Sequence, residues 1–190
     1  MSDTIKLTPR AVAYAFHQEG LVREAYKDSE GVWTWAGGVT NASGHEVYPR
    51  YKDNPQTLEH CLEITVWLMR STYLAAVQRA FAGSTLNEAQ VAAALSFQWN
   101  TGAITATEWV CDWKAGKPAS ARSFLTTHYL NGGDLTERRK SEAALFFDGH
   151  WPGDLRCPVY PVRKPSYTPN FGKRELIDLV PTLEAMGGWK

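Results

Sequence analysis

The sequence lacks the features that would place it in a membrane or cross-link it. None of its 190 residues belongs to an apolar run of about 18 or more, so a transmembrane helix is not expected. Residues 1–20 show no basic stretch followed by an apolar core, so we expect no secretory signal and synthesis into a cytoplasm. Three dispersed cysteines without a CxxC spacing favour reduced thiols over a disulfide or a metal site: Cys61, Cys111 and Cys157.

The chain also lacks an excess of either charge. Its 20 Lys and Arg residues balance 20 Asp and Glu residues, so we do not expect a protein that neutralises nucleic-acid phosphates along a broad surface. Its 5 histidines are dispersed without the spacing of metal ligands. We therefore expect no nucleic-acid partner, no metal site and no cofactor.

What is present is the composition of an ordinary globular protein, 44% hydrophobic and 21% charged. A chain of this length can bury one sizeable core or two small ones. Thr8 and Pro9 suit the N-cap and first position of a helix and Gly20 suits its end, so residues 9–19 predict a helix. Residues 26–50 contain β-branched and aromatic residues between turn signals and predict a β-hairpin or meander.

Helical patterns dominate the rest of the chain up to residue 148. The longest predicted helix begins at Asn54-Pro55 and ends near Phe81, and Thr85–Glu88 predicts a capping box for the next helix. After His150, repeated prolines interrupt an extended segment that cannot form a regular helix or a central strand. Residues 173–180 predict a last short helix.

Residues 19–34 contain groups that are suited to acid–base chemistry. Glu19 lies at the carboxyl end of the first predicted helix, where the helix dipole disfavours an ionised carboxyl, as a general acid requires. Asp28 lies in a turn, and Thr34 lies on the strand that follows it. An isolated Glu/Asp pair is most often solvated surface, but here a helix end, a turn and a strand converge on one segment.

The spacing Glu19, eight residues, Asp28, five residues, Thr34 resembles the phage-type lysozymes of glycoside hydrolase family 24. Two less specific segments also resemble this family. One is the helix that ends at Asn100-Thr101-Gly102, and the other is the Arg-Arg-x-x-Glu-x-x-Leu-Phe pattern over residues 138–146.

The resemblance covers about residues 9–148 and implies an α+β, mainly α, lysozyme-like fold. In this fold a small β-hairpin or meander lobe, about residues 20–53, is joined by the long helix to a larger helical lobe, about residues 54–148. Residues 149–190 would form a Pro-rich C-terminal extension packed on the same catalytic domain, residues 1–148.

The resemblance further implies an endolysin muramidase, which hydrolyses the β-1,4 bond between N-acetylmuramic acid and N-acetylglucosamine in bacterial peptidoglycan and so lyses the host cell. Glu19 would protonate the glycosidic oxygen. Asp28 would act as the base, or electrostatic partner, for the attacking water, and Thr34 would help to position that water. Further candidates for substrate binding are Trp35, Gly38, Trp99, Asn100 and Arg138.

Each candidate for substrate binding could instead have a purely structural role. Most tryptophans belong to protein cores, Asn100 could cap its helix, and Gly37-Gly38 could serve the backbone alone. Arg138-Arg139-Lys140 predicts a solvated helix face more readily than a wall-binding site, with Arg138 and Glu142 as an i,i+4 pair.

The sequence departs from the family pattern just after Thr34. Where the family has Gly-x-Gly-His-Thr, this chain has Ala36 at the first glycine and Val39 at the histidine. The departure leaves open a non-catalytic muramidase-like domain that binds or scaffolds peptidoglycan. A lytic transglycosylase, which forms an anhydro sugar without water, is the other alternative.

A phage or prophage endolysin of this kind would stay in the host cytoplasm until lysis and would then act on the periplasmic cell wall. Without a signal or anchor it would depend on a holin-type membrane lesion. We expect a monomer whose partner is the glycan strand of peptidoglycan, with no stable membrane insertion.

Overall fold

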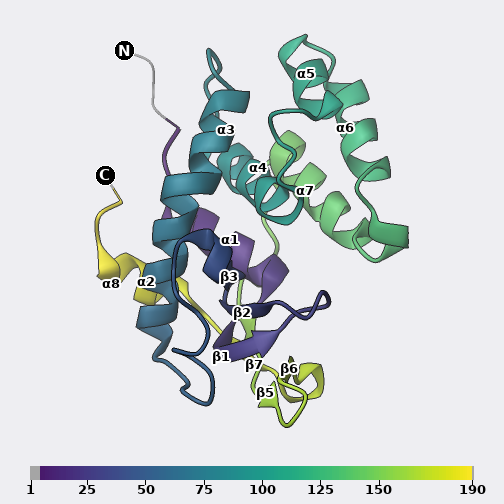
Figure 1. Cartoon of the computed structure of the whole chain (residues 1–190). Coiled ribbons are helices and arrows are strands. Elements are labelled where there is room, and N and C mark those ends of the chain that lie inside the picture. The colour runs from purple at the N-terminus through teal and green to yellow at the C-terminus, as the bar shows by residue number, and fades with distance from the viewer. Residues whose placement is uncertain (1–4, 190) are drawn as a thin grey trace. The chain divides into compact units, whose positions relative to one another are not determined.

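The computed structural model describes residues 5–189, whose helices and strands are labelled in Figure 1. These residues form two compact units. Unit 1 comprises residues 5–15, 70–154 and 189, and unit 2 comprises residues 16–69 and 155–188. Two helical stretches pass from one unit into the other: α1 (Pro9–Glu19) and the run from α2 to α3. Within the described part of the chain, no helix is both long and apolar enough to cross a membrane.

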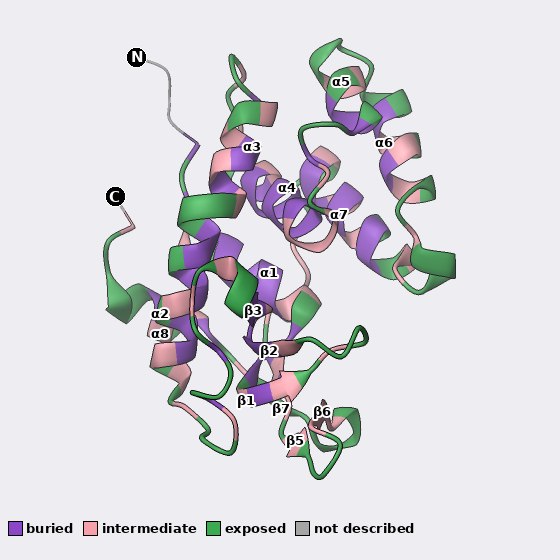
Figure 2. Ribbon diagram, viewed as in Figure 1, coloured by how far each residue is buried: buried purple, intermediate pink, exposed green. Residues whose placement is uncertain are grey.

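Helices form most of unit 1. They are α3 (Leu74–Ala80), α4 (Glu88–Thr101), α5 (Glu108–Lys114), α6 (Pro118–Thr127) and α7 (Thr136–Asp148), with a 3₁₀ turn at Asn131–Gly133. Helix α4 lies against α7, and its residues 91–98 are all buried, as Figure 2 shows by their colour. Burial on every side is typical of a central helix. The core around it is aromatic, with rings at centroid distances of 5.0–5.9 Å: Phe81, Phe97, Trp109 and Phe146.

Helix α4 begins with a different cap from the one that the sequence pattern suggests. Its N-cap is Asn87, whose side chain accepts a hydrogen bond from the Gln90 N–H at 2.9 Å, while Gln90 Oε1 accepts one from the Asn87 N–H at 3.0 Å. The predicted Thr85–Glu88 capping box is therefore wrong, because an asparagine and a glutamine complete the same reciprocal geometry two residues later. The predicted end is confirmed, since Gly102 adopts a left-handed φ of 66°.

The long helix predicted over residues 54–81 is present with a later start. Thr57 is the N-cap of α2 (Leu58–Leu68), and its hydroxyl accepts from the His60 N–H at 3.2 Å, so the predicted start at Asn54-Pro55 is wrong. A π-helical turn, Met69–Tyr73, connects α2 to α3. The boundary between the two units falls in this turn, between residues 69 and 70, whereas the sequence suggests a limit near residue 54.

Unit 2 contains a β-meander over residues 22–40, whereas the sequence predicts it over residues 26–50. Strands β1 (Val22–Lys27), β2 (Trp33–Ala36) and β3 (Val39–Thr40) form one antiparallel sheet in that order, followed by a 3₁₀ turn at Asn41–Ser43. Tyr26 and Lys27 pair with Thr34 and Trp33, and the register then shifts towards the Val22–Ala36 pair. The sheet therefore places the residues just before Asp28 opposite the residues around Thr34.

Residues 155–188 form short strands and a helix that belong to unit 2. Strand β4 (Cys157–Val159) pairs with β7 (Glu175–Ile177), and β5 (Val162–Arg163) pairs with β6 (Thr168–Pro169). A 3₁₀ turn, Phe171–Lys173, precedes β7, and α8 (Val180–Met186) follows it and lies against α2. The predicted helix over residues 173–180 is therefore wrong, because residues 175–177 pair in a strand. The buried Leu179 and Leu183 attach this segment to the core of unit 2.

None of the three cysteines forms a disulfide, as their spacing predicts. Cys61 of α2 and Cys157 of β4 are buried, whereas Cys111 of α5 is exposed. Burial raises the pKa of Cys61 and of Cys157 to about 12, so both thiols stay protonated at neutral pH. Cys61 and Cys157 therefore fill core positions and are poor nucleophiles.

Candidate active site

Asp28 follows β1, and its carboxylate closes the turn that leads into β2. Its Oδ1 atom accepts hydrogen bonds from the backbone N–H groups of Glu30 at 3.0 Å and Val32 at 2.9 Å. The Gly31 N–H donates to the Asp28 carbonyl at 3.0 Å, and Gly31 adopts the left-handed φ of 77° that this turn requires. Because both amides bind the same oxygen, the turn fixes the carboxylate and leaves Oδ2 for another partner.

Thr34 is that partner. Its hydroxyl oxygen lies 3.1 Å from Asp28 Oδ2 and 3.1 Å from the Val32 carbonyl oxygen, and the side chain is buried on β2. A hydroxyl has one proton, so Thr34 can donate to only one of these acceptors at a time. In either case the oxygen keeps lone pairs that can accept a hydrogen bond from a water molecule. Asp28 and Thr34 thus form a pair that can orient one water.

Glu19 is the last residue of α1 and is exposed. The helix ends there because Gly20 has a φ of 80° and its N–H donates to the Phe16 carbonyl at 2.7 Å. The predicted helix, its cap and its end are all confirmed, since Thr8 Oγ1 accepts from the Ala11 N–H at 3.1 Å. A carboxyl group at this position faces solvent at the negative end of the helix dipole.

Tyr26 lies close enough to Glu19 and Asp28 to feel both charges, and it is not among the residues predicted from the sequence. It pairs with Thr34 across β1 and β2. Burial raises the pKa of Tyr26, and the negative charges of Glu19 and then Asp28 raise it further, so its hydroxyl stays protonated at neutral pH. Both carboxylates therefore act electrostatically on one phenol. Its place two residues before Asp28, at the start of the segment predicted as a β-hairpin or meander, is the signal that could have revealed it.

The departure from the family pattern lies in the turn between β2 and β3. Ala36 adopts a φ of 52°, a left-handed conformation that glycine tolerates far better than alanine, at a cost of about 1–2 kcal/mol. Gly38 has a φ of 100°, and its N–H donates to the Trp35 carbonyl at 3.2 Å. Val39 is completely buried. Ala36 therefore strains the turn, while the strands on either side stay paired through Thr34 and Thr40.

Trp35 is completely buried. Its ring stacks on Tyr51 at 3.9 Å, and its Nε1–H donates to the Arg23 carbonyl at 3.1 Å. The ring therefore offers no face to a sugar in this structure. Trp33 is only half-buried, and it stacks on Tyr48 at 4.8 Å.

Two further candidates, Asn100 and Arg138, belong to a buried polar network in unit 1. Glu142 Oε1 accepts from Arg138 Nε at 3.0 Å and from Ser96 Oγ at 2.6 Å, and Oε2 pairs with Arg139. Arg139 also donates to Asn100 Oδ1. The predicted Arg138–Glu142 pair is confirmed, but a solvated face is wrong for both arginines, because they are buried against this carboxylate.

Trp99 lies one residue before Asn100 on α4 and is half-buried. Its ring stacks almost parallel on Tyr73, at a centroid distance of 5.6 Å. Unlike Trp35, it keeps some exposed surface. It therefore remains a candidate for contact with a sugar ring.

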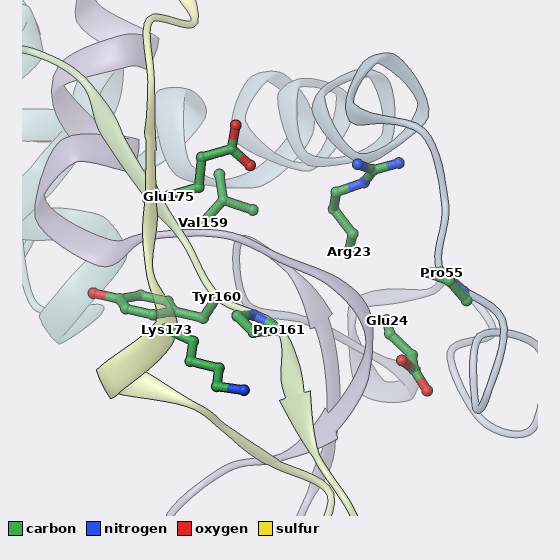
Figure 3. Close-up of a pocket in the computed structure, with 8 residues that line it drawn as sticks. All are labelled: Arg23, Glu24, Pro55, Val159, Tyr160, Pro161, Lys173 and Glu175. Atoms are coloured by element: carbon green, nitrogen blue, oxygen red, sulfur yellow. The ribbon is translucent and has the colours of Figure 1, made fainter.

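A separate pocket of about 500 Å³ lies in unit 2 between β1 and residues 159–175 (Figure 3). The side chains that line it are Arg23, Glu24, Pro55, Val159, Tyr160, Pro161, Lys173 and Glu175. Two acidic and two basic groups balance one another there. Glu19, Asp28 and Thr34 do not line it, so this pocket is distinct from the candidate active site.

The helical core of unit 1, the antiparallel meander of unit 2 and the Glu19–Asp28–Thr34 segment define a lysozyme-like protein. The phage lysozyme family model matches residues 17–142, about two thirds of the chain, and this range includes all three residues. The chain belongs to the phage lysozyme family. This membership supports a peptidoglycan hydrolase, with peptidoglycan as its substrate.

Solved structures show the same fold at low sequence identity. An endolysin from Escherichia coli O157:H7 phage FAHEc1 is 22% identical with a TM-score of 0.65, covering 77% of this chain and 96% of its own. A mutant of P22 lysozyme is 22% identical with a TM-score of 0.62, covering 74% and 97%. The muramidase domain of SpmX from Asticaccaulis excentricus is 22% identical with a TM-score of 0.56, covering 75% and 97%. The comparison with curated proteins finds no match.

Proposed function

We propose that this protein is an endolysin muramidase that hydrolyses the β-1,4 bond between N-acetylmuramic acid and N-acetylglucosamine. The observation that supports this most directly is that the two carboxylate oxygens of Asp28 have different partners. Two backbone amides fix Oδ1, while Oδ2 lies 3.1 Å from the Thr34 hydroxyl. A peptidoglycan-binding domain without turnover has no need of such a water-orienting pair.

In the proposed reaction, Glu19 donates its proton to the glycosidic oxygen as the bond from that oxygen to C1 breaks. The electron pair of that bond stays with the leaving oxygen, and positive charge develops on the sugar ring. Water bound to Thr34 and Asp28 attacks C1, and its released proton passes to Asp28. The negative charge of Asp28 also stabilises the developing oxocarbenium ion. One water molecule is consumed for each bond that is broken.

The substrate-binding candidates take different parts in this proposal. Trp99 would contact a sugar ring through its exposed surface, and Gly38 would allow close approach of the glycan to the backbone. Asn100 and Arg138 would act indirectly, through the network that surrounds Glu142. Trp35 takes no part, because it is buried.

We further propose that the protein acts as a monomer at the end of a phage or prophage cycle. It would stay in the host cytoplasm until a holin-type lesion gives it access to the periplasmic wall. Coexpression with and without a pore-forming holin tests this route, because lysis from inside the cell should occur only with the pore. Lysis at the same rate without the pore would overturn it.

The activity is tested by the turbidity of permeabilised Gram-negative cells. We expect the wild type to clear the suspension, Glu19→Gln to leave it turbid, and Glu137→Gln to match the wild type, because Glu137 is an exposed carboxylate of α7. Clearing by the wild type but not by Glu19→Gln supports the proposal. Tight binding of the wild type to purified sacculi without clearing would instead establish a peptidoglycan-binding domain.

A further inference from the structure

The C-terminal segment, residues 155–188, is bonded to both ends of the strand that connects the two carboxylates. At the Glu19 end, the Leu21 N–H donates to the Pro158 carbonyl at 2.9 Å, and the Tyr160 N–H donates to the Leu21 carbonyl at 2.9 Å. At the Asp28 end, the Lys27 N–H donates to the Tyr167 carbonyl at 2.6 Å. The segment is therefore attached two residues after Glu19 and one residue before Asp28.

Tyr167 makes the contacts at the Asp28 end, and it uses three different groups. Its carbonyl accepts from Lys27, and its ring packs edge-on against Trp33 at a centroid distance of 5.3 Å. Lys27 and Trp33 pair with each other across β1 and β2. They are also the residues that immediately precede Asp28 and Thr34. Tyr167 therefore contacts the backbone or the side chain next to each member of the water-orienting pair.

The third group of Tyr167, its hydroxyl, fixes the residue to the rest of unit 2. It donates to the carboxylate of Asp53, whose oxygens lie at 3.0 and 2.9 Å. Lys164 also binds Asp53 and pairs with Glu24 at 2.8 Å. Hydrogen bonds from Lys164 and Tyr167 hold the pKa of Asp53 below its ordinary value, so Asp53 stays an anion at neutral pH.

The backbone of Tyr167 is itself under constraint. It has a φ of 57°, which is unfavourable for an aromatic residue and persists only where several contacts specify the conformation together. Its N–H donates to the Arg163 carbonyl at 2.7 Å, which closes the turn between β5 and β6. The residue is therefore held from its backbone, its ring and its hydroxyl at once.

We infer that Tyr167 is a positioning residue, which holds the Lys27–Trp33 pair in place and so sets the separation between Asp28 Oδ2 and Thr34 Oγ1. The inference rests on the proposed function of Asp28 and Thr34. That pair acts on the water during bond cleavage and not on the bound glycan. Loss of Tyr167 should therefore lower kcat and leave KM nearly unchanged.

The test compares Tyr167→Ala, Tyr167→Phe and Phe171→Ala on soluble glycan strands from peptidoglycan. Phe171 is a matched control, because it lies in the same segment, is 69% exposed and packs on Tyr160. We expect Tyr167→Ala to lower kcat about tenfold with KM within about twofold. Tyr167→Phe should restore most of the loss, because it keeps the ring that packs on Trp33, and Phe171→Ala should match the wild type.

A second readout does not depend on activity. The N–H groups of Glu30 and Val32 are protected by Asp28, so their hydrogen exchange reports on the placement of its carboxylate. We expect exchange at these two amides to be about tenfold faster in Tyr167→Ala than in Phe171→Ala, with the amides of α4 unchanged. Should Tyr167→Ala fail to fold, Tyr167→Leu preserves an apolar side chain and serves the same comparison.

Two outcomes separate the inference from the function on which it rests. Equal kcat values and equal amide exchange in Tyr167→Ala and Phe171→Ala would overturn the positioning role even if the wild type is a muramidase. An inactive wild type would overturn the proposed function, and the amide exchange would still decide whether Tyr167 positions Asp28.

Discussion

Two carboxylates, Asp28 of unit 2 and Glu142 of unit 1, are both fixed by hydrogen bonds, but their donors differ. Glu142 is completely buried between Arg138 and Arg139, so both of its oxygens face positive charge. Asp28 is half-buried, and its donors are two backbone amides and a hydroxyl. Neutral donors orient Asp28 without cancelling its charge.

The difference separates a structural carboxylate from one that is available for chemistry. Both oxygens of Glu142 accept charge-assisted hydrogen bonds, and the side chain is completely buried, so it is not accessible to a substrate. In the proposed reaction, Asp28 would supply negative charge beside a hydroxyl that can bind water, as a developing cation on a sugar ring requires. The same residue class therefore serves two purposes, and the surrounding donors decide which.

The largest expected effect on stability follows from removing the charge of Glu142, which is buried between two arginines. Glu142→Gln removes the charge between two buried guanidinium groups and should lower the free energy of unfolding by about 3–5 kcal/mol. Denaturation by urea measures this loss. The control is Glu137→Gln on the same helix, whose exposed pair with Lys140 should contribute less than about 1 kcal/mol. Equal stability of the two variants would contradict a structural role for the Glu142 charge.

The converse change, Asp28→Asn, should affect activity far more than stability. The amide oxygen can still accept from Glu30 and Val32, so we expect the free energy of unfolding to change by less than about 1 kcal/mol. Without the negative charge, turnover of peptidoglycan should fall about 100-fold. Glu30→Gln, an exposed neighbour in the same turn, should keep wild-type activity. Should Glu30→Gln fall as far as Asp28→Asn, the effect would belong to the turn and not to Asp28.

The surroundings of Asp28 depend on nearby residues, whereas those of Glu142 depend also on another helix, and the sequence predicts the first kind of feature better than the second. Local signals were sufficient for α1, because Thr8 and Gly20 act within one turn of their own helix. They predicted a hairpin or meander around Asp28, but they missed most of its first strand, which begins at Val22 and not near residue 26. They failed for Arg138 and Arg139, whose positive charges predict a solvated surface. Their burial depends on Glu142 and Ser96, and the serine lies on a different helix.

The C-terminal segment shows the same limit for backbone pairing. Residues 175–177 become a strand only because Cys157–Val159 supplies its hydrogen-bonding partner, and no local pattern encodes that pairing. The N-cap of α2 is Thr57 and not the predicted Asn54. Both residue types suit an N-cap, so the local sequence could not decide between them. Trp33 and Trp35 point to the same side of β2 by alternation, so periodicity could not separate the half-buried ring from the buried one.

A smaller effect on stability is expected at Ala36, the last residue of β2, where the backbone is strained. Ala36→Gly removes the left-handed strain at a φ of 52° and should raise the free energy of unfolding by about 1 kcal/mol. Gly38→Ala, at a φ of 100° in the same turn, should lower it. Thermal unfolding of both variants measures the pair. A destabilised Ala36→Gly would show that the alanine methyl contributes more packing than its conformation costs.

The smallest effect concerns His45, whose ring stacks on Trp35 of β2 at a centroid distance of 5.9 Å. Its Nε2 lies 2.8 Å from the Tyr51 hydroxyl, and burial, then the charge of Arg50, then His60 lower its pKa below the ordinary value of 6.5. The unfolded chain therefore binds the proton more tightly. The stability that depends on neutral His45 is complete above about pH 6.5 and is lost as the pH falls.

The His45 prediction is checked by thermal unfolding between about pH 7.5 and about pH 5.5. His45→Gln should lose less stability than the wild type over this interval, whereas His150→Gln, at an exposed position, should follow the wild type. Identical pH dependence in all three proteins would show that His45 does not contribute.

The central claim is that Glu19, Asp28 and Thr34 hydrolyse the muramic acid linkage with water. The most direct measurement is mass spectrometry of fragments released from purified peptidoglycan and then reduced with borohydride. We expect reducible N-acetylmuramic acid at every new end with the wild type, and no new ends with Glu19→Gln. Non-reducible anhydromuramic ends would establish a transglycosylase, and new N-acetylglucosamine ends would establish cleavage of the other linkage; either result would overturn the proposed muramidase reaction.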